Sequence, residues 1–484
     1  MNIVPLLESL VEEILSAETL FYENPKDFHS LETSVKTSTE SFAAAFLGAV
    51  LTGLDEGIFN SDWRNEKYSV QRRDKRTIIS SVGDITFDCT YYRGIGKYKG
   101  FSHLVEDVIG LERNERFTEA AEVAMLCEAL KTSYSEASKI LPSKQKITKT
   151  TVMNKIHSIA EEIPDTIYKE RRNVPYLFIE ADEDHVAEQH GKTDNTDKNK
   201  SFISKLIYIY EFKKESSVKG RYELVNKYYF SGIYPGINGN RMLWEKVSRF
   251  IDNNYNSEGI KRIFISGDGA PWIKSGTSYI DKSVFCADKY HLMQYINTAA
   301  CQIDGKKEDI KSDLWHMLHA RNKSAKRQFD IYTQEMLLSA KKPDKVETLR
   351  AYVLGNWAAI RRTLNNELIN GCSAESHVSH VLSDRLSSRP MGWSQTGADR
   401  MSKLRCYEKN NGQAKIIELV KYSRKERKLA KTGTDDSESI KYSISNIIRD
   451  QYNQLSKYYE CLQVHIPYGT ARKTISIREQ LQLL

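Results

Sequence analysis

The 484-residue sequence has no long uninterrupted apolar run. The longest run, from Phe42 to Leu54, is broken by glycine and threonine, and it is shorter than the roughly 20 residues that a membrane helix needs. The amino terminus has no basic start and instead carries Glu8, Glu12 and Glu13 among its apolar residues. We therefore expect an amphipathic helix there, with neither a signal peptide nor a membrane span.

Cysteines and glycine-rich phosphate loops are also scarce. The sequence has seven cysteines, an odd number, and no two of them have the C-x-x-C spacing of zinc knuckles and redox pairs. This scatter argues against a disulfide framework and fits a reducing cytoplasm. Neither G-x-x-x-x-G-K-[ST] nor G-x-G-x-x-G occurs, so the phosphate-binding loop of nucleotide-driven enzymes is absent from the sequence.

The composition is ordinary, but the charge is unevenly distributed. With 40% hydrophobic and 28% charged residues, the chain can bury a sizeable core. Its net charge is +7, and residues 371–431 hold 13 Lys and Arg against 6 Asp and Glu, an excess equal to that of the whole chain. Such a segment indicates either a solvated helix face or contact with a polyanion, and composition alone leaves both open.

Changes in hydrophobic period divide the chain into segments. Apolar residues recur at helical spacing in some segments, whereas short β-branched and aromatic runs between 173 and 303 predict strands that come to alternate with helices. This order is typical of a mixed α/β sheet. The predicted segments are an N-terminal helical region (1–75), a β-hairpin around Val82-Gly83-Asp84 with a linker (76–116), a three-helix segment (117–172), the first part of an α/β core (173–303), an all-helical insertion (304–370), the second part of the core with the basic segment (371–431) and a helical tail (432–484).

The third helix predicted in 117–172 begins with small polar and basic residues. Thr148 is a suitable N-cap, and Lys149, Thr151, Asn154 and Lys155 follow it. Residues of these types reach phosphates and base edges when a recognition helix enters the major groove of DNA. A plain three-helix bundle gives a similar pattern, so a helix-turn-helix and a bundle both fit the sequence.

Acids gather where two predicted strands end. The run VPYLFIEA is followed by Asp182, Glu183 and Asp184, and the run IFISG is followed by Asp268. Like charges this close raise one another's pKa unless a cation offsets them. A solvated strand end is the simpler interpretation. The more specific interpretation is a Mg²⁺ or Mn²⁺ site, because these ions prefer oxygen ligands. The choice of Asp182 over Asp184 as the metal ligand depends on the register of the strand.

A third acid follows the predicted helical insertion. Glu375 lies in the first turn of a predicted helix with Ser373 as its N-cap, where the helix dipole favours a carboxylate. A third carboxylate from a distant part of the chain would complete such a Mg²⁺ or Mn²⁺ site. We therefore take Asp182, Asp268 and Glu375 as candidate metal-binding residues.

Four stretches carry a family resemblance. IEADEDHV, ISGDGAPWIK, DKYHL and GCSAESHVSHVLSDRLSSRPMGWSQTGADRMSKLR together resemble the ISLre-type insertion-sequence transposases, a DDE family related to the Mutator-like transposases. The resemblance covers nearly the whole chain and implies a ribonuclease H-like catalytic core interrupted by an all-helical insertion, with a DNA-binding N-terminal region. The helix-turn-helix of that region would be the three-helix segment 117–172. It makes Asp182, Asp268 and Glu375 the catalytic acids. Asp288 and His291 match a supporting Asp-x-x-His element.

The resemblance also implies an activity and its partners. A DDE transposase would bind the terminal inverted repeats of its own insertion sequence and catalyse end cleavage and strand transfer with two Mg²⁺ or Mn²⁺ ions. Its partners would be double-stranded DNA, at the transposon ends and the target, and further copies of itself, in the cytoplasm of a bacterium at the nucleoid. A catalytically idle DNA-binding regulator is the rival. The residues expected to contact DNA are Lys149, Thr151, Asn154, Lys155, Arg385, Arg389, Arg400, Lys403, Arg405, Arg424, Lys425, Arg427 and Lys428.

Overall fold

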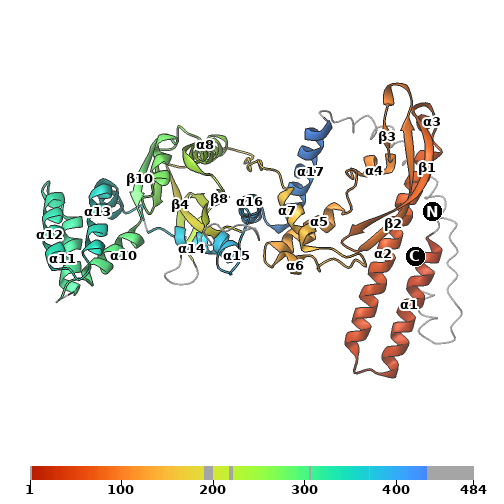
Figure 1. Cartoon of the computed structure of the whole chain (residues 1–484), viewed down its shortest axis with the longest axis horizontal. Helices are drawn as coiled ribbons and strands as arrows, with labels where there is room; N and C mark the ends of the chain where they lie inside the picture. The colour runs from red at the N-terminus through yellow and green to blue at the C-terminus, as the bar shows by residue number, and fades with distance from the viewer. Residues whose placement is uncertain (1–2, 190–199, 217–221, 305–306, 370, 433–484) are drawn as a thin grey trace. The chain divides into compact units, whose positions relative to one another are not determined.

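The computed structural model describes residues 3–189, 200–216, 222–304, 307–369 and 371–432 (Figure 1). The chain divides into two compact units. The first unit comprises the described parts of Met1–Glu128, Tyr134–Val152 and Val420–Leu484, and the second comprises those of Ala129–Ser133 and Met153–Leu419. Beyond Thr432, the helical tail predicted for 432–484 lies outside the described residues.

Two long helices begin the first unit. α1 (Val4–Glu23) and α2 (Phe28–Phe59) pack against each other. The Asp27 carboxylate caps α2, because its Oδ1 accepts a hydrogen bond from the Ser30 backbone amide at 3.1 Å. The apolar residues that are spaced three and four apart in this region therefore form helices, as the sequence predicts.

By length and composition, α2 is the one helix among the described residues that could cross a membrane, so the expectation that the chain has no membrane span stays a prediction.

Within the unit, α2 packs on a β-hairpin. At Gly48 a Cβ would lie 2.4 Å from the Thr86 carbonyl oxygen, so only glycine allows this approach. The buried Asp55 accepts a hydrogen bond from the Thr90 amide at 2.9 Å, which fixes the helix against the same strand.

The hairpin is formed by β1 (Tyr68–Ser80) and β2 (Gly83–Gly94), which pair antiparallel across a two-residue turn. β1 starts earlier than expected, so the predicted helical region ends at residue 67 rather than 75. Residues 68–75 are mostly polar and show no clear alternation, and their pairing with β2 makes them a strand. The short elements of this region are α3 (Asp62–Lys67), η1 (Gly96–Tyr98), β3 (Phe101–Ser102) and α4 (Leu104–Ile109).

The segment predicted to hold three helices contains α5 (Glu119–Ala129), α6 (Tyr134–Ala137) and α7 (Lys149–His157). The middle helix has only 4 residues, which is shorter than the sequence pattern suggests. Thr148 acts as the expected cap of α7, because its Oγ1 accepts a hydrogen bond from the Thr151 amide at 3.2 Å.

The last described helix, α17 (Ile416–Thr432), carries the most basic part of the sequence. The Arg424 guanidinium is buried and donates to the Glu122 carboxylate at 2.6 and 3.1 Å, and Arg427 donates to Glu112 at 3.0 and 3.2 Å. Each of these two arginines thus pairs with an acid of the first unit, and their expected contact with DNA stays a prediction. Removing one partner of the buried pair of Arg424 and Glu122 would leave an uncompensated charge.

A five-stranded mixed sheet forms the centre of the second unit, and this confirms the predicted α/β class. In spatial order its strands are β8 (Tyr228–Gly232), β5 (Ser201–Tyr210), β4 (Tyr176–Ala187), β9 (Arg262–Gly267) and β10 (Ser283–Ala287). β5 runs antiparallel to β4 and β8, whereas β4, β9 and β10 are parallel to one another. The strand expected over RYELVNKYYFSGIY is divided at Asn226, which has φ 53°, into β8 and β7 (Tyr222–Val225), and β7 pairs with β6 (Phe212–Glu215).

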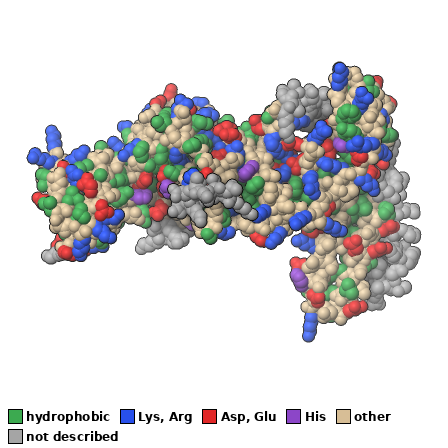
Figure 2. All heavy atoms as spheres, in the orientation of Figure 1, with side chains coloured by type: hydrophobic (Ala, Val, Ile, Leu, Met, Phe, Trp, Pro, Cys, Tyr) green, Lys and Arg blue, Asp and Glu red, His purple; other side chains and the backbone are tan. Residues whose placement is uncertain are grey.

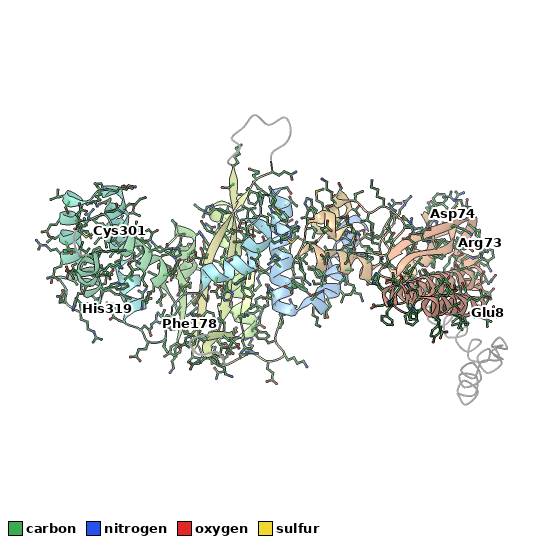
Figure 3. The ribbon with its side chains drawn as sticks, turned by 90° about the horizontal axis from the view of Figure 1, so that it is seen from below. Glu8, Arg73, Asp74, Phe178, Cys301 and His319 are labelled. Carbon is green, nitrogen blue, oxygen red and sulfur yellow. The ribbon has the colours of Figure 1, made fainter. Side chains whose placement is uncertain are left out.

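Alternate residues of β4 point to opposite faces of this sheet. Leu177, Ile179 and Ala181 join the apolar core formed with α8 (Gly236–Asn254) and α9 (Pro271–Lys274). Phe178 points to the other face, where its ring stacks on two aromatic neighbours (Figure 3). Helices from the last part of the unit, α14 (Ala374–Val378), α15 (Asp384–Leu386) and α16 (Gln395–Asn411), lie on that second face (Figure 1).

Among its described residues, the region between the two parts of the sheet unit contains helices and connecting loops but no strand. Its helices are α10 (Lys289–Ala300), α11 (Lys307–His319), α12 (Ala325–Ser339) and α13 (Pro343–Leu364), and they share an apolar core that includes Leu292, Leu318, Phe329 and Val353. Burying each such side chain stabilises the fold by about 1.5–3 kcal/mol. α13 returns to the sheet, where the Thr363 hydroxyl donates to the Ala287 carbonyl oxygen at 2.8 Å.

Candidate active site

Three aspartates lie in one row across three neighbouring parallel strands, directly after the last residues of β9 and β10 and within β4. β9 and β10 stay in parallel register up to the pair Gly267 and Ala287. The next residues in that register are Asp268 and Asp288, and the Asp288 amide donates to the Gly267 carbonyl oxygen at 2.9 Å. On the other side of β9, the register of β4 brings Asp182 to the same row. The strand topology thus unites acids that are far apart in the sequence.

His291 faces these acids. Its Nδ1 lies 2.7 Å from Asp288 Oδ2, and this hydrogen bond is the main cause of its raised pKa, to which the charges of Asp182 and Asp268 also contribute. Asp288 in addition caps α10, because its Oδ1 accepts a hydrogen bond from the Tyr290 amide at 2.9 Å. The imidazole is therefore fixed beside the carboxylates, and its protonated form offsets part of their repulsion.

The Asp182 carboxyl is costly to ionise. Burial raises its pKa from 3.8 to about 6, and the negative charges of Asp268 and Glu183 act in the same direction. The Glu183 backbone amide, which donates to Asp182 Oδ1 at 2.8 Å, and the nearby His291 oppose this rise. The ionised cluster therefore destabilises the metal-free fold, and a bound cation would remove that cost.

This cost predicts how Asp182→Asn changes stability. Because the pKa of Asp182 is higher in the folded state than in the unfolded state, its carboxyl contributes to folding stability at low pH. This contribution is complete below about pH 4 and is lost as the pH rises through about 6. At pH 7.5 in a chelator, Asp182→Asn should therefore raise the free energy of unfolding by about 1–3 kcal/mol, and the gain should vanish near pH 4. Urea unfolding at the two pH values measures this difference. A variant less stable than the wild type at pH 7.5 would contradict the assigned cause.

β4 does not end at Asp182, contrary to the expectation from sequence. It continues to Ala187 in antiparallel pairing with β5, and only its parallel partner β9 ends at this point. Asp184 consequently lies inside the strand, on the same face as Asp182, where it is buried and accepts a hydrogen bond from the Ser387 hydroxyl at 2.8 Å. Asp184 is thus a packing residue of this face, not an exposed acid beyond the strand.

The turn after β9 fixes Asp268. Asp268 Oδ1 accepts a hydrogen bond from the Ala270 amide at 2.8 Å, and Gly269 between them has φ 99°, a conformation that other residues rarely adopt. A Cβ at Gly269 would lie 3.3 Å from the Asn356 side-chain nitrogen, so glycine also leaves room for a residue of α13. The backbone conformation and the nearby Asn356 side chain therefore explain why glycine follows Asp268.

Two polar residues of α13 complete the surroundings of the acids, and the sequence did not identify them. α13 is kinked at Asn356 (φ −119°, ψ 15°), whose buried Oδ1 has no hydrogen-bond partner among the described residues. The Tyr352 hydroxyl is buried and likewise unpaired there; burial raises its pKa, and the charges of Asp288 and Asp268 add to the rise. A lone asparagine in the apolar stretch VLGNWAAI was the signal available in the sequence.

Glu180 holds the start of α14, the helix that carries Glu375. The Ser373 amide and hydroxyl donate to Glu180 Oε2 at 2.6 and 3.0 Å, Tyr210 donates to Oε1 at 2.6 Å, and Lys213 Nζ lies 3.2 Å from Oε1. These bonds and the Lys213 charge outweigh the burial of Glu180, and its pKa is lowered. Ser373 occupies the expected N-cap position, but its hydroxyl binds Glu180 and not a helix amide.

Glu375 itself is exposed in the first turn of α14. The structure brings its helix to Glu180, two residues before Asp182 on the same face of β4. Within the described residues, the direct hydrogen bond of the cluster joins the side chains of Asp288 and His291, and Glu375 takes no part in it. The chain continues from α14 into η3 (Ser379–Ser383), a π-helical turn of a kind that is frequent at functional sites.

Several basic residues predicted to contact DNA have internal partners instead. Arg385 is 4% exposed and donates to a backbone carbonyl group at 2.8 Å, Lys403 pairs with Asp399 at 3.0 Å, and Arg405 donates to backbone carbonyl groups. Arg400 also pairs with Asp399. Internal bonds already engage the charged groups of these four residues, and their expected contact with DNA stays a prediction.

Other predicted DNA contacts remain accessible. Arg389 and Lys425 are exposed, and Lys428 is partly exposed. On the face drawn in Figure 2, Lys and Arg side chains are interspersed with acidic ones and do not gather in one patch. The basic residues of 371–431 thus include both internally paired and exposed side chains.

α7 presents most of its predicted polar residues to solvent. Lys149 and Asn154 are exposed and Thr151 is partly exposed, as a DNA-contacting face requires. Lys155 is only 9% exposed, which makes it a weaker candidate for DNA contact than the exposed residues of α7, and its assignment stays a prediction. It lies on the buried side of the helix with Val152 and Ile156.

Fold and site together define a mixed α/β protein with an aspartate–histidine cluster in one row across three parallel strands. The chain belongs to the uncharacterised protein family UPF0236, whose family pattern matches residues 22–423. Two relatives come from Caldanaerobacter subterraneus subsp. tengcongensis. One UPF0236 protein, whose name covers eleven loci, is 34% identical over 416 residues, which are 85% of this chain and 84% of the relative. Another, whose name covers four loci, is 34% identical over 398 residues, 81% of this chain and 80% of the relative.

Among solved structures, the chain has a distant similarity to the Drosophila P element transposase strand transfer complex. The alignment covers 65% of this chain and 82% of the other, with 11% sequence identity and a TM-score of 0.23.

Proposed function

We propose that this protein is a DDE transposase that binds the terminal inverted repeats of an insertion sequence and catalyses DNA end cleavage and strand transfer. The observation that carries the proposal is the row formed by Asp182 and Asp268 on neighbouring parallel strands. The strand order β8-β5-β4-β9-β10, with β5 antiparallel, supports a ribonuclease H-like core interrupted by the helical region α10–α13. The quoted motifs support the ISLre type.

The names of the relatives support the same proposal. They cover eleven and four loci of one genome, and a gene that moves by transposition accumulates copies in its host. Action on chromosomal DNA would place the protein in the bacterial cytoplasm at the nucleoid. Assembly of two element ends with a target calls for more than one copy of the chain.

The residues of the site fit hard divalent cations. Asp182, Asp268 and Glu375 offer only carboxylate oxygens, which Mg²⁺ and Mn²⁺ prefer, and the raised pKa of Asp182 indicates a local excess of negative charge. The unpaired oxygens of Asn356 and Tyr352 are further polar groups for water or substrate. When bound, two such ions would stabilise the attacking and leaving oxygens of an in-line phosphodiester displacement.

The other side chains have positioning roles in this proposal. Asp288 orients His291 through Nδ1, which leaves Nε2 of the imidazole for a phosphate oxygen or a water molecule. Glu180 fixes the start of α14 and, through it, the approach of Glu375 to the acids. Water attacks at the element's end, and the 3′-hydroxyl that is released then attacks the target strand.

Binding of the element's ends is assigned to α7, whose exposed side carries Lys149 and Asn154. Lys149→Ala should weaken binding to the terminal repeat and reduce the slope of log K against log salt by about 1, because one phosphate contact is lost. The control is Lys345→Ala, which removes an exposed lysine at the start of α13. Fluorescence anisotropy across a salt titration measures both variants, and equal slopes would count against α7 as the recognition helix.

The proposed activity is tested with purified protein and DNA that flanks its gene. In Mg²⁺ the wild-type chain should cut at the terminal repeats, leave 3′-hydroxyl ends and join them to a plasmid target, and a chelator should stop both steps. Binding of the repeats without any cutting in Mg²⁺ or Mn²⁺ would favour the regulator instead. An absence of both binding and cutting would overturn the proposal.

A further inference from the structure

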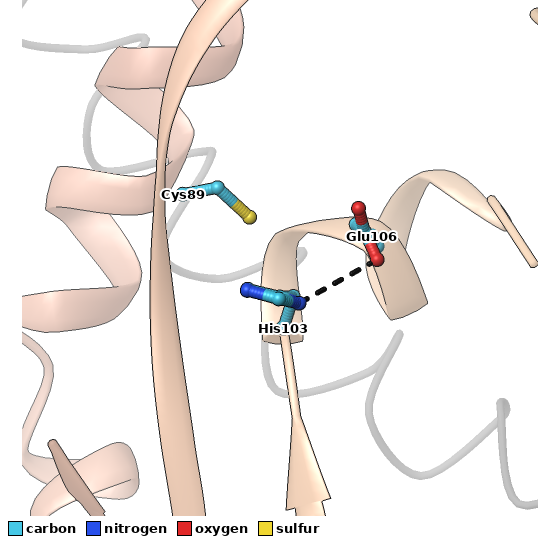
Figure 4. A group of neighbouring side chains, drawn as sticks. All are labelled: Cys89, His103 and Glu106. Carbon is cyan, nitrogen blue, oxygen red and sulfur yellow. Dashed lines mark ion pairs between the residues drawn. The ribbon is translucent and has the colours of Figure 1, made fainter. Parts of the chain in front are cut away.

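We propose that the first unit holds a second metal site, of a different chemical kind, in which Cys89, His103 and Glu106 bind Zn²⁺. One sulfur, one nitrogen and one oxygen atom from these residues all lie within 4.8 Å of one another (Figure 4). Cys89 comes from β2, whereas His103 and Glu106 come from the start of α4. The ion would therefore join α4 to the hairpin.

The spacing suits a tetrahedral ion. Ligand atoms about 2.0–2.3 Å from a tetrahedral Zn²⁺ lie about 3.3–3.8 Å apart. His103 Nδ1 is 3.7 Å from Glu106 Oε2, so these two atoms already have a suitable separation. Cys89 is fully buried and Glu106 is 6% exposed, whereas the His103 side chain is 24% exposed. A buried group of three such ligands with one accessible member resembles a metal site more than a solvated surface.

Groups around the three residues are arranged as the outer shell of a metal site. The second nitrogen of His103, Nε2, lies 3.7 Å from Asp74 Oδ2, and a metal-binding histidine usually turns its other nitrogen toward a carboxylate. Asp74 is in turn held by the Arg72 guanidinium at 2.8 Å. On Glu106, the Oε1 atom is 2.7 Å from Arg76 Nε, which leaves Oε2 for the ion. His103 and Glu106 are thus each oriented by a charged neighbour, while His103 Nδ1 and Glu106 Oε2 remain available to bind the ion.

The ligand set selects the ion. A thiolate with an imidazole and a carboxylate favours Zn²⁺ over Mg²⁺, which prefers oxygen ligands alone. Three protein ligands leave a fourth position for water, and His103, Glu106, Arg76 and Tyr91 line an adjoining pocket of about 280 Å³. The site is independent of the aspartate cluster, which belongs to the second unit.

The experiment measures zinc and cobalt binding by the full chain. Protein refolded with Zn²⁺ should retain about one equivalent after dialysis, and Co²⁺ in its place should give the thiolate-to-metal absorption band that only a cysteine ligand produces. Cys89→Ser should abolish the band and the retained zinc. The matched control is Cys301→Ser, which changes an exposed cysteine of the helical region (Figure 3) and should leave both unchanged.

Further variants keep the test decisive if Cys89→Ser does not fold. His103→Gln, at a partly exposed position, should weaken zinc binding by at least about 100-fold, and Asp74→Asn should weaken it by about 10–100-fold, as loss of an outer-shell partner does. Equal zinc retention in wild type and His103→Gln would overturn the site, as would a cobalt spectrum without a thiolate band. The zinc site and the proposed cleavage centre are tested independently. Asp182→Asn should bind zinc as the wild type does, so loss of the zinc site would not count against DNA cleavage.

Discussion

Asp182→Asn and Asp268→Asn are each expected to reduce DNA end cleavage and strand transfer by at least about 10³-fold, because loss of a metal ligand removes several kcal/mol of transition-state stabilisation. Both substitutions keep the shape of the side chain and remove only its charge. Glu375→Gln is expected to have the same effect if Glu375 is the third ligand. Gel assays on DNA carrying the element's ends measure the two steps separately.

Two observations accompany this prediction. Binding to the element's ends should persist in all three variants, since it is assigned to α7 and not to the acids. Asp281→Asn is a suitable control, because Asp281 is an exposed acid of the same unit that lies outside the row. Asp184→Asn is not, since Asp184 is buried in β4 and its loss would change packing. If the variants at Asp182 and Asp268 both cut like the wild type, the site lies elsewhere.

Glu180→Gln is expected to give the second largest loss. It removes the charge opposite Lys213 and places an amide nitrogen or a weaker acceptor before the Ser373 amide, so the start of α14 loses its fixed position. Breaking such a buried pair costs about 3–5 kcal/mol of stability. Because a positioning residue is lost, we also expect cleavage to fall by about 10–100-fold.

A double variant separates the two effects of this substitution. Glu180→Gln combined with Lys213→Met removes both charges, so most of the lost stability should return. Cleavage should stay low, because the introduced amide is still a poorer acceptor for the Ser373 amide than the native carboxylate. Urea unfolding and cleavage rates on the two variants distinguish the cases. Recovery of the full cleavage rate together with stability would show that Glu180 acts on stability alone.

The strands and helices of the second unit were predictable because their signals are local. VPYLFIEA, KLIYIYEF and IFISG are short apolar runs of the kind that forms a buried sheet, and the helical period between 304 and 370 is regular. The acids stood out for the same reason: a charge directly after a buried run is visible in sequence. The sequence alone therefore identifies Asp182 and Asp268 as candidates, and the parallel register of β4 and β9 brings them together.

Other features depend on contacts between distant segments, and the sequence pattern does not encode these. Strand β4 continues past Asp182 because β5 pairs with it, although its own residues there are acidic. Tyr352 and Asn356 approach the acids only because α13 folds back onto the sheet and bends at one residue. The role of Glu180 in holding α14 could not be predicted, because its partners lie up to 193 residues away in the sequence.

The internal pairing of the basic segment likewise depends on distant contacts that the sequence pattern does not encode. Counting charges treats each Lys or Arg as solvated, yet Arg424 is paired with Glu122, 302 residues away in the sequence, and Arg385 is bound to backbone carbonyl oxygen. Such pairs neutralise a charge run from within the fold. Lys149 and Arg389, which are exposed, remain the better candidates for phosphate contact.

The most direct test of the aspartate row as a metal-dependent DNA cleavage centre is the metal preference of Asp182→Cys. A thiolate is a poor ligand for Mg²⁺ and a better one for Mn²⁺, so a variant in which cysteine replaces a true ligand should depend on the ion. We predict that Asp182→Cys fails to cut the element's ends in Mg²⁺ and regains cleavage in Mn²⁺, while the wild type cuts in both. Cleavage by Asp182→Cys at the wild-type rate in Mg²⁺ would contradict the account.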